Sequence, residues 1–193
     1  FQDQLQATSM QVINNDVTVE TTYYVYDAGG QRVRKVTELA TGQVKDERIY
    51  LGGFEIYRRH GADALVRETL HIMDDQQRIA LVETRTQGDD DSLPRLIRYQ
   101  LGNHLGSASL ELDDAGQVIS YEEYYPYGST SYQAVRGQTE TPKRYRYTGM
   151  ERDEESGLNY HGARYYAAWL GRWVQADPIG IDGGQNIFSY CNA

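Results

Sequence analysis

Hydrophobic and polar positions alternate over short stretches of this chain, and turn residues separate the stretches. Residues 18–26 are rich in β-branched and aromatic side chains and partly alternate. Asp27-Ala28-Gly29-Gly30 follows, and residues 31–37 resume the pattern. Asp favours the first position of a type I turn, and Gly favours the last, where a positive φ is often needed. The pattern therefore predicts two strands joined by a tight turn.

The same punctuation recurs along the chain. Asp74–Gln77 and Asp113–Gly116 each separate two apolar stretches, and Asp153–Gly157 is a looser copy that is one residue longer. This is a degenerate hairpin repeat. We expect a mainly β fold of antiparallel hairpins in a curved sheet, with an open strand at its N-terminal edge, because repeat folds bury their core only by stacking neighbours.

Three segments depart from the repeat. Residues 86–94 are acidic and turn-rich, but their three adjacent Asp lack the alternating ligands and closing Glu of a calcium loop, so a solvated loop is favoured. Residues 131–142 read as an irregular connector. Residues 164–170, followed by Gly171, predict a short helix.

Composition narrows the function classes. The chain has 193 residues and a formal net charge of −9, which argues against a nucleic-acid-binding face and against attraction to an acidic membrane. No stretch approaches the roughly 20 apolar residues of a membrane span. Tyr, with 17 copies against three Phe and two Trp, is the main large apolar residue. Packing between sheets, with the hydroxyl at the edge, is favoured over stacking on sugars.

The single cysteine and the two ends carry little chemistry. Cys191 has no partner for a disulfide framework, and we expect it to be buried as a small hydrophobe. Phe1–Gln4 lacks the basic and apolar regions of a signal peptide. We interpret both ends as cuts in a longer polypeptide.

Several motifs together resemble one family. Tyr26–Gly30 resembles the tyrosine-aspartate repeat of the Rhs/YD-repeat family. Residues 101–107 are similar to its Asp-His-Leu-Gly-Ser segment, with Asn103 at the Asp position, and residues 121–128 to its Tyr-Asp-Pro-Tyr-Gly segment. The longest match resembles the Rhs repeat-associated core domain, which also occurs in the C subunit of Tc toxins. Its matched elements are, in order, Tyr147–Gly149, Ser156–Tyr160, Gly162–Tyr166, Gly171–Trp173, Asp177–Gly180 and Gly183–Tyr190.

The resemblance, which covers Thr22 to Ala193, implies an architecture and a role. In this family the repeats wind as a β-hairpin spiral into a hollow cocoon, the core domain closes one end, and a variable C-terminal toxin lies inside. By analogy, residues 1–145 are the C-terminal end of the shell and residues 146–193 the core region. The implied partners are the upstream YD-repeat shell, the protein's own C-terminal toxin cargo, and a secretion-system spike or another Tc-toxin subunit. The implied protein is bacterial, made in the cytoplasm and secreted or delivered into target cells, and it needs no cofactor.

The family also implies a chemistry, in which an aspartic-protease-like site cuts the toxin from the shell. Such a site needs two close carboxylates whose pKa values are pushed apart, so that one activates water and the other donates a proton. By position, Asp177 in the motif Asp177–Ile181 is one of them, and its partner is expected beyond Ala193, so this chain alone is incomplete as an enzyme. Arg164 matches the family's essential Arg, which would hold one carboxylate ionised or bind the peptide.

The same residues also fit purely structural roles. Asp177 also fits a turn, Arg164 a structural ion pair, and the nearby Asp182 a turn before two glycines. The whole chain also fits a structural or adhesive scaffold that is never cleaved.

Other catalytic and metal-binding arrangements are weaker. A Ser-His-Asp set from His104, Ser107 and Asp113 lacks a nucleophile elbow and an oxyanion-hole signal. The four His share no metal-ligand spacing, so no metal site is expected.

Overall fold

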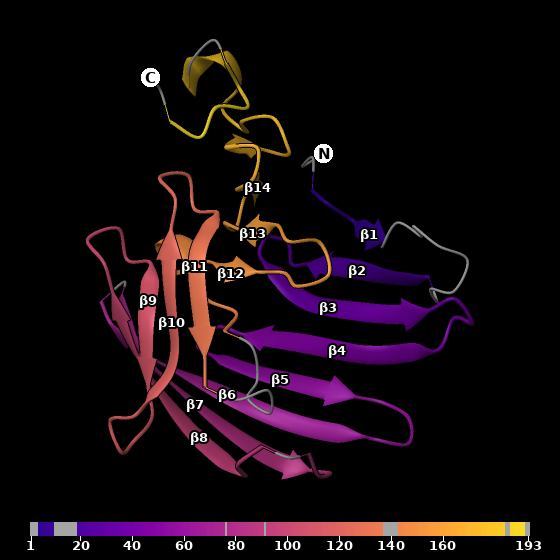
Figure 1. Cartoon of the computed structure of the whole chain (residues 1–193). Coiled ribbons are helices and arrows are strands. Elements are labelled where there is room, and N and C mark those ends of the chain that lie inside the picture. Colours follow the sequence, from indigo (N-terminus) through magenta and orange to yellow (C-terminus); the bar gives the residue numbers. More distant parts are fainter. Residues whose placement is uncertain are drawn as a thin grey trace.

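The chain folds into two antiparallel β-sheets (Figure 1). The computed structural model describes residues 4–9, 19–75, 77–90, 92–136, 143–183 and 186–191. Within these residues the only helical elements are two 3-10 turns, η1 (Tyr147–Gly149) and η2 (Gly180–Gly183). None of the described residues forms a helix long and apolar enough to cross a membrane.

The first sheet has eleven strands, and each strand pairs with its neighbours in sequence. This meander follows from the repeated hairpin pattern of the sequence, and it leaves β1 and β11 at the two edges. The strands are β1 (Ala7–Ser9), β2 (Glu20–Tyr26), β3 (Arg32–Leu39), β4 (Val44–Leu51), β5 (Phe54–Arg59), β6 (Leu65–Asp74), β7 (Gln77–Gln87), β8 (Arg95–Gly102), β9 (Ala108–Leu112), β10 (Val118–Tyr124) and β11 (Thr130–Val135). Figure 1 shows the sheet strongly curved, so that β9–β11 turn back toward the first strands.

The predicted turns are confirmed. Asp27–Gly30 joins β2 to β3 and Asp113–Gly116 joins β9 to β10, while Asp74 and Gln77 pair at the β6–β7 turn, where Gln76 lies outside the described residues. The Asp27 carboxylate accepts the backbone N–H groups of Gly29 and Gln31, both at 2.9 Å. The same pattern of side-chain acceptance recurs at Asp113 and Asn103. A side chain that accepts two N–H groups across the turn explains why an Asp or Asn opens each one.

The second sheet has four short strands, β12 (Glu151–Arg152), β13 (Asn159–Tyr160), β14 (Tyr165–Ala167) and β15 (Arg172–Trp173). Asp153–Gly157 forms the β12–β13 turn, as predicted. In Figure 1 these strands lie between β2–β3 and β10–β11. Ion pairs agree with that placement. Asp153 pairs with Arg32 and Lys35 on β3, and Lys143, just before this sheet, pairs with Glu122 on β10.

The predicted helix at 164–170 is wrong, because Tyr165–Ala167 is a strand and Ala168–Leu170 a turn. Side chains of β14 and of Ala168, which follows it, point alternately into two cores: Tyr165 and Ala167 into one, Tyr166 and Ala168 into the other. A strand buried on both faces gives a continuous apolar run, which periodicity cannot distinguish from a short buried helix. Gly171, with φ +62°, completes the turn that leads into β15.

Tyrosines build most of both cores, as predicted. Tyr147 and Tyr166 pack with Tyr124, Trp173 and Tyr190, and Tyr165 packs with Tyr26 and Tyr160. Their hydroxyls are hydrogen-bonded at the rim, for example Tyr166 to the Tyr127 carbonyl at 2.9 Å and Tyr147 to the Pro126 carbonyl at 2.9 Å. The cores therefore place apolar rings inside and still satisfy each hydroxyl.

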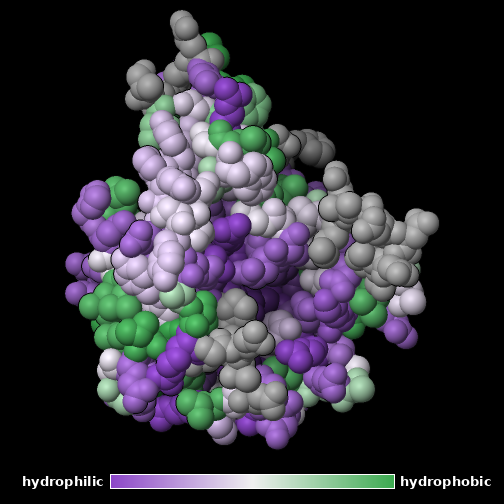
Figure 2. Space-filling model, viewed as in Figure 1, coloured by the Kyte–Doolittle hydropathy of each residue, from purple (hydrophilic) through white to green (hydrophobic). Residues whose placement is uncertain are grey.

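Buried charge joins the second sheet to the first. The Arg32 guanidinium, on β3, contacts Glu151 and Asp153 at 2.6 Å each, and Lys35 lies 2.9 Å from Asp153. Arg144 links Glu151 to Glu55 on β5, at 2.7 Å on both sides. Figure 2 shows hydrophilic residues on the surface in the middle of the visible face, where β12 and β3 lie in Figure 1.

Candidate active site

Asp177 opens a turn just after β15 and has the geometry of the repeat turns. Its carboxylate Oδ1 accepts the backbone N–H of Ile179 at 3.1 Å, and its carbonyl accepts that of Gly180 at 2.8 Å. The turn interpretation of Asp177 is therefore satisfied by one carboxylate oxygen. The second oxygen, Oδ2, remains available for another partner.

That partner is Arg164. Its Nη1 lies 2.9 Å from Asp177 Oδ2, in an ion pair that is 17% exposed on the Arg side and 21% on the Asp side. The approach is not aligned as a hydrogen bond, and Nη1 has no hydrogen-bond partner within the described structure. The structure thus brings together the two residues that the sequence singles out, 13 positions apart, and leaves the pair partly open to water.

The β14–β15 hairpin fixes this pair. Arg164 precedes β14 and Asp177 follows β15, and Tyr166 pairs with Trp173 between them. The Arg164 guanidinium lies 4.1 Å from the centre of the Trp173 ring, a cation–π contact. The buried side chain of Gln175 accepts the Tyr165 N–H at 2.8 Å, which anchors the start of β14.

Aromatic residues pack around Trp173, the ring that contacts Arg164. The His161 ring lies 5.0 Å from Trp173 and 5.9 Å from Tyr166, edge to face in both cases, and Tyr190 contacts Trp173 at 5.2 Å. Burial lowers the pKa of His161 to about 4, and the charge of Arg164 acts in the same direction. His161 is therefore neutral at neutral pH.

Arg32 contacts the site indirectly, through Tyr165, which follows Arg164 in the chain. Its guanidinium donates to the Tyr165 hydroxyl at 3.2 Å and lies 4.3 Å from the centre of the Tyr160 ring. Neither Arg32 nor His161 belongs to the residues predicted from sequence. The ion-pair partners of Arg32 lie 119 and 121 positions away, so no local spacing could reveal them.

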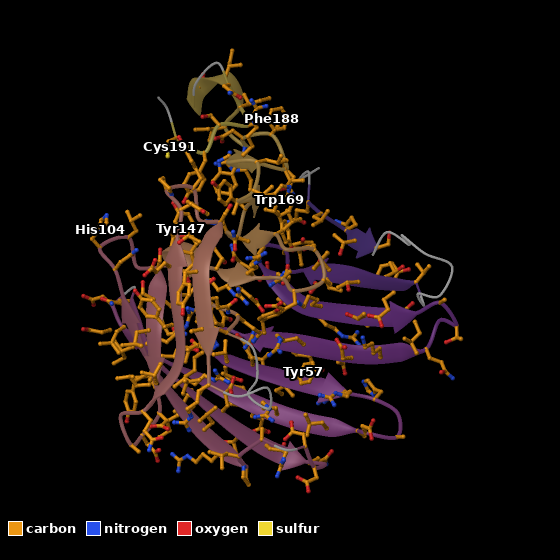
Figure 3. All side chains as sticks on the ribbon, in the orientation of Figure 1. Tyr57, His104, Tyr147, Trp169, Phe188 and Cys191 are labelled. Carbon is orange, nitrogen blue, oxygen red and sulfur yellow. The ribbon has the colours of Figure 1, made fainter. Side chains whose placement is uncertain are left out.

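An open groove of about 510 Å³ lies next to this cluster, lined by aromatic and apolar residues. Tyr190 lines the groove and also contacts His161 and Trp173, so it belongs to both. Figure 3 shows Trp169, Phe188 and Cys191 in this C-terminal part of the molecule. The prediction that Cys191 is buried is wrong: it is exposed, because it lies at the edge of the groove rather than in a core.

The weaker arrangements do not form. His104 is exposed at the tip of the β8–β9 turn (Figure 3), whereas Ser107 is buried and its hydroxyl accepts the Thr148 N–H at 2.9 Å. Asp113 is used by its own turn and by Arg136 at 3.3 Å.

The acidic residues predicted to lie in loops and turns form no metal site among the described residues. In the acidic loop, Asp90 pairs with Arg67 and Arg85 at 2.7 Å each, and these contacts hold the loop against β6 and β7. Asp182 lies exposed in η2. Among the described residues, no cluster of three or more His, Cys, Asp or Glu is arranged to hold a metal.

The pair can supply one half of an acid–base site. A carboxylate that pairs with an arginine and is partly exposed can accept a proton from a water molecule. Within the described part of the chain, no hydrogen bond or ion pair joins Asp177 to a second carboxyl group. A proton-donating partner would have to come from elsewhere.

This chain is similar in sequence and structure to subunits of bacterial toxins. No protein-family model matches this chain. Toxin subunit YenC1 of Yersinia entomophaga is 39% identical over 175 residues, which cover 86% of this chain and 18% of that protein. Toxin subunit YenC2 of the same organism is 34% identical over 188 residues, or 94% of this chain and 19% of that protein. The crystal structure of TcdB2-TccC3 without its hypervariable C-terminal region matches 96% of this chain with a TM-score of 0.84 and 34% identity.

The chain is a homologue of Tc toxin C subunits and Rhs-like toxins over most of its length. It spans less than a fifth of the two Yersinia subunits and 9% of the TcdB2-TccC3 chain. The mainly β fold of this C-subunit homologue is confirmed by its own strands and by the TcdB2-TccC3 match. The division at residues 145 and 146 stays a prediction, as do the roles of Asp177 and Arg164.

Proposed function

We propose that this segment lies where the shell of an Rhs-type toxin ends and its self-cleaving core begins. The observation that carries the proposal is the Arg164–Asp177 ion pair at 2.9 Å, partly open to water at the end of the second sheet. The homology to YenC1 and YenC2 supports it, because both are toxin subunits. The core then releases a C-terminal toxin by aspartic-type cleavage of its own chain.

In this mechanism Asp177 is the ionised carboxylate. It takes a proton from a water molecule, whose oxygen attacks the carbonyl carbon of the scissile peptide bond. A second carboxyl group, expected downstream of Ala193, donates a proton to the carbonyl oxygen, which gives a tetrahedral intermediate. The intermediate then collapses: its C–N bond breaks, the hydroxyl proton returns to the second carboxyl group, and the proton that Asp177 took from water passes to the leaving amine nitrogen. Arg164 holds the Asp177 carboxylate in place through the contact of its Nη1 with Oδ2.

The shell role rests on the first sheet. Its curvature and sequential strand order suit a spiral that continues through further repeats before β1 and closes around a cargo. TccC3, the relative in the solved complex, has a hypervariable C-terminal region and is joined to TcdB2. By analogy, we propose a variable toxin cargo after this segment, a B-type subunit or a secretion-system spike as partner, and delivery into target cells.

The direct test replaces Asp177 by Asn in the full-length protein. An amide can neither accept the proton of water nor exist as a carboxylate, so the chain should stay at full length on a denaturing gel while the wild type is cut. Asp113→Asn is the matched control, because Asp113 also caps a turn through Oδ1 and pairs with an arginine through Oδ2. It should be cut like the wild type. Normal cleavage of Asp177→Asn would remove Asp177 from the mechanism, and an uncut wild type would favour the scaffold interpretation.

Arg164 is tested at matched folded fraction in the same protein. Arg164→Ala should abolish or greatly slow cleavage, and Arg164→Lys should restore it only partly, because Lys keeps the charge and loses the fork. If folded Arg164→Ala is fully cleaved, the arginine has only a structural role.

A further inference from the structure

An unsatisfied nitrogen atom, His161 Nε2, lies in a hairpin turn next to the candidate site. Three buried side-chain polar atoms have no hydrogen-bond partner within the described residues: Arg32 Nε, His161 Nε2 and Arg164 Nη1. Arg32 Nε lies among tyrosine rings that stack on its guanidinium. Arg164 Nη1 lies 2.9 Å from Asp177 Oδ2 in the ion pair described above. His161 Nε2 has no such explanation, and buried polar groups are normally hydrogen-bonded.

The backbone holds His161 and Arg164 together. His161 donates its N–H to the Arg164 carbonyl at 2.9 Å, across the turn between β13 and β14. Both side chains rest on Trp173, the His161 ring at 5.0 Å and the Arg164 guanidinium at 4.1 Å from its centre. His161 therefore lies beside Arg164, which pairs with Asp177.

The neighbours of His161 leave its Nε2 unused. The aromatic rings around it offer faces and edges but no hydrogen-bond acceptor to Nε2. Because its pKa is lowered to about 4, the ring stays neutral and presents either an N–H or a lone pair at Nε2. The main chain of a peptide offers the complementary C=O or N–H group.

We propose that His161 Nε2 hydrogen-bonds the main chain of the peptide segment that Asp177 cleaves. His161 is then a substrate-binding residue, and the ligand class is an extended polypeptide. This inference rests on the proposed self-cleavage, and it adds a residue that positions the scissile segment. Tyr190, which contacts His161 and lines the apolar groove, gives that segment a surface on which to lie.

The competing explanation is that the His161 ring only packs against Trp173 and Tyr166. Two substitutions separate the explanations because they make opposite changes. His161→Phe keeps a flat ring and removes the nitrogen. His161→Gln removes the ring and keeps an amide that can place either an N–H or an oxygen near the Nε2 position.

The experiment follows cleavage of the full-length protein in a time course of pulse-labelled cell-free synthesis. Wild type, His161→Phe, His161→Gln and Asp177→Asn are compared at matched folded fraction, measured by resistance to brief proteolysis. We expect His161→Phe to be cut about tenfold more slowly than the wild type, the effect of one lost hydrogen bond to a bound peptide. We expect His161→Gln to be cut faster than His161→Phe.

Each outcome decides the inference. Slow cleavage of His161→Phe with faster cleavage of His161→Gln supports the hydrogen bond. His161→Phe cut at the wild-type rate, or His161→Gln no faster than His161→Phe, overturns it even if Asp177→Asn is uncut. Cleavage of Asp177→Asn, or no cleavage of the wild type, overturns the proposed function and with it the role of His161.

Discussion

Arg32→Met removes the buried cation that ties the second sheet to β3. The Arg32 side chain is fully buried, and it contacts Glu151 and Asp153 at 2.6 Å each and the hydroxyls of Tyr50 and Tyr165 at 3.1 and 3.2 Å. Met fills much of the same volume but supplies no charge and no donor. Two buried carboxylates then lose a partner at once.

The size of the effect follows from burial. Breaking a buried ion pair by removing one partner costs about 3–5 kcal/mol, because the other charge stays buried. Glu151 keeps Arg144 at 2.7 Å, and Asp153 keeps Lys35 at 2.9 Å, so neither carboxylate is left entirely unpaired. We therefore expect Arg32→Met to lower the free energy of unfolding by about 3 kcal/mol, the low end of that range.

Arg34→Met is the matched control. Arg34 lies on the same strand and pairs with Glu47 at 2.6 Å, but its side chain is 47% exposed. Exposed ion pairs contribute about 0–1 kcal/mol, so this variant should unfold almost like the wild type. Urea unfolding of the 193-residue chain, followed by fluorescence, measures both variants. The two tryptophans of the chain, Trp169 and Trp173, both lie in the part that Arg32 holds in place.

Free energies of unfolding that differ by no more than about 1 kcal/mol between the two variants, the scale of a surface pair, would contradict this role of Arg32. An Arg32→Lys variant as stable as the wild type would contradict it too. Lys keeps one charge, but it has no planar fork with which to reach both carboxylates.

Two further predictions use other parts of the structure. Burial alone would raise the pKa of Glu151, but Arg32 and Arg144 outweigh it and lower the pKa to about 2. In the unfolded chain the pKa of a Glu is about 4.3. The stabilisation that ionised Glu151 contributes is therefore complete above that pH and is lost as the pH falls through its folded pKa. The difference in unfolding free energy between wild type and Glu151→Gln should therefore shrink by about 3 kcal/mol from pH 6 to pH 2, and a constant difference would contradict the assignment. Gly128→Ala should lower the thermal midpoint more than Gly116→Ala. Both glycines have positive φ (+86° and +74°), but only at Gly128 would the new Cβ overlap the Tyr147 ring. Strain costs about 1–2 kcal/mol at each site and overpacking about 1–3 more at Gly128, so equal midpoints would refute the contact.

The sequence determined the hairpins of this protein. Asp27 and Asp113 open turns whose hydrogen bonds lie within four or five residues, and alternation fixes the flanking strands. These interactions are local, so residue type and spacing are enough to reveal them. The same holds for the Asp177 turn, although its use of a second carboxylate oxygen for Arg164 is visible only in three dimensions.

Tertiary structure decided what lies between the hairpins. Residues 165–167 form a strand instead of the predicted helix because two cores bury both of its faces, and no local pattern encodes that double burial. The ion pairs of Arg32 and the unpaired nitrogen of His161 likewise depend on how the second sheet packs against the first. Burial and long-range pairing change the charge and the hydrogen-bonding needs of a side chain. Only the folded arrangement therefore showed which polar residues of this sequence support the candidate site.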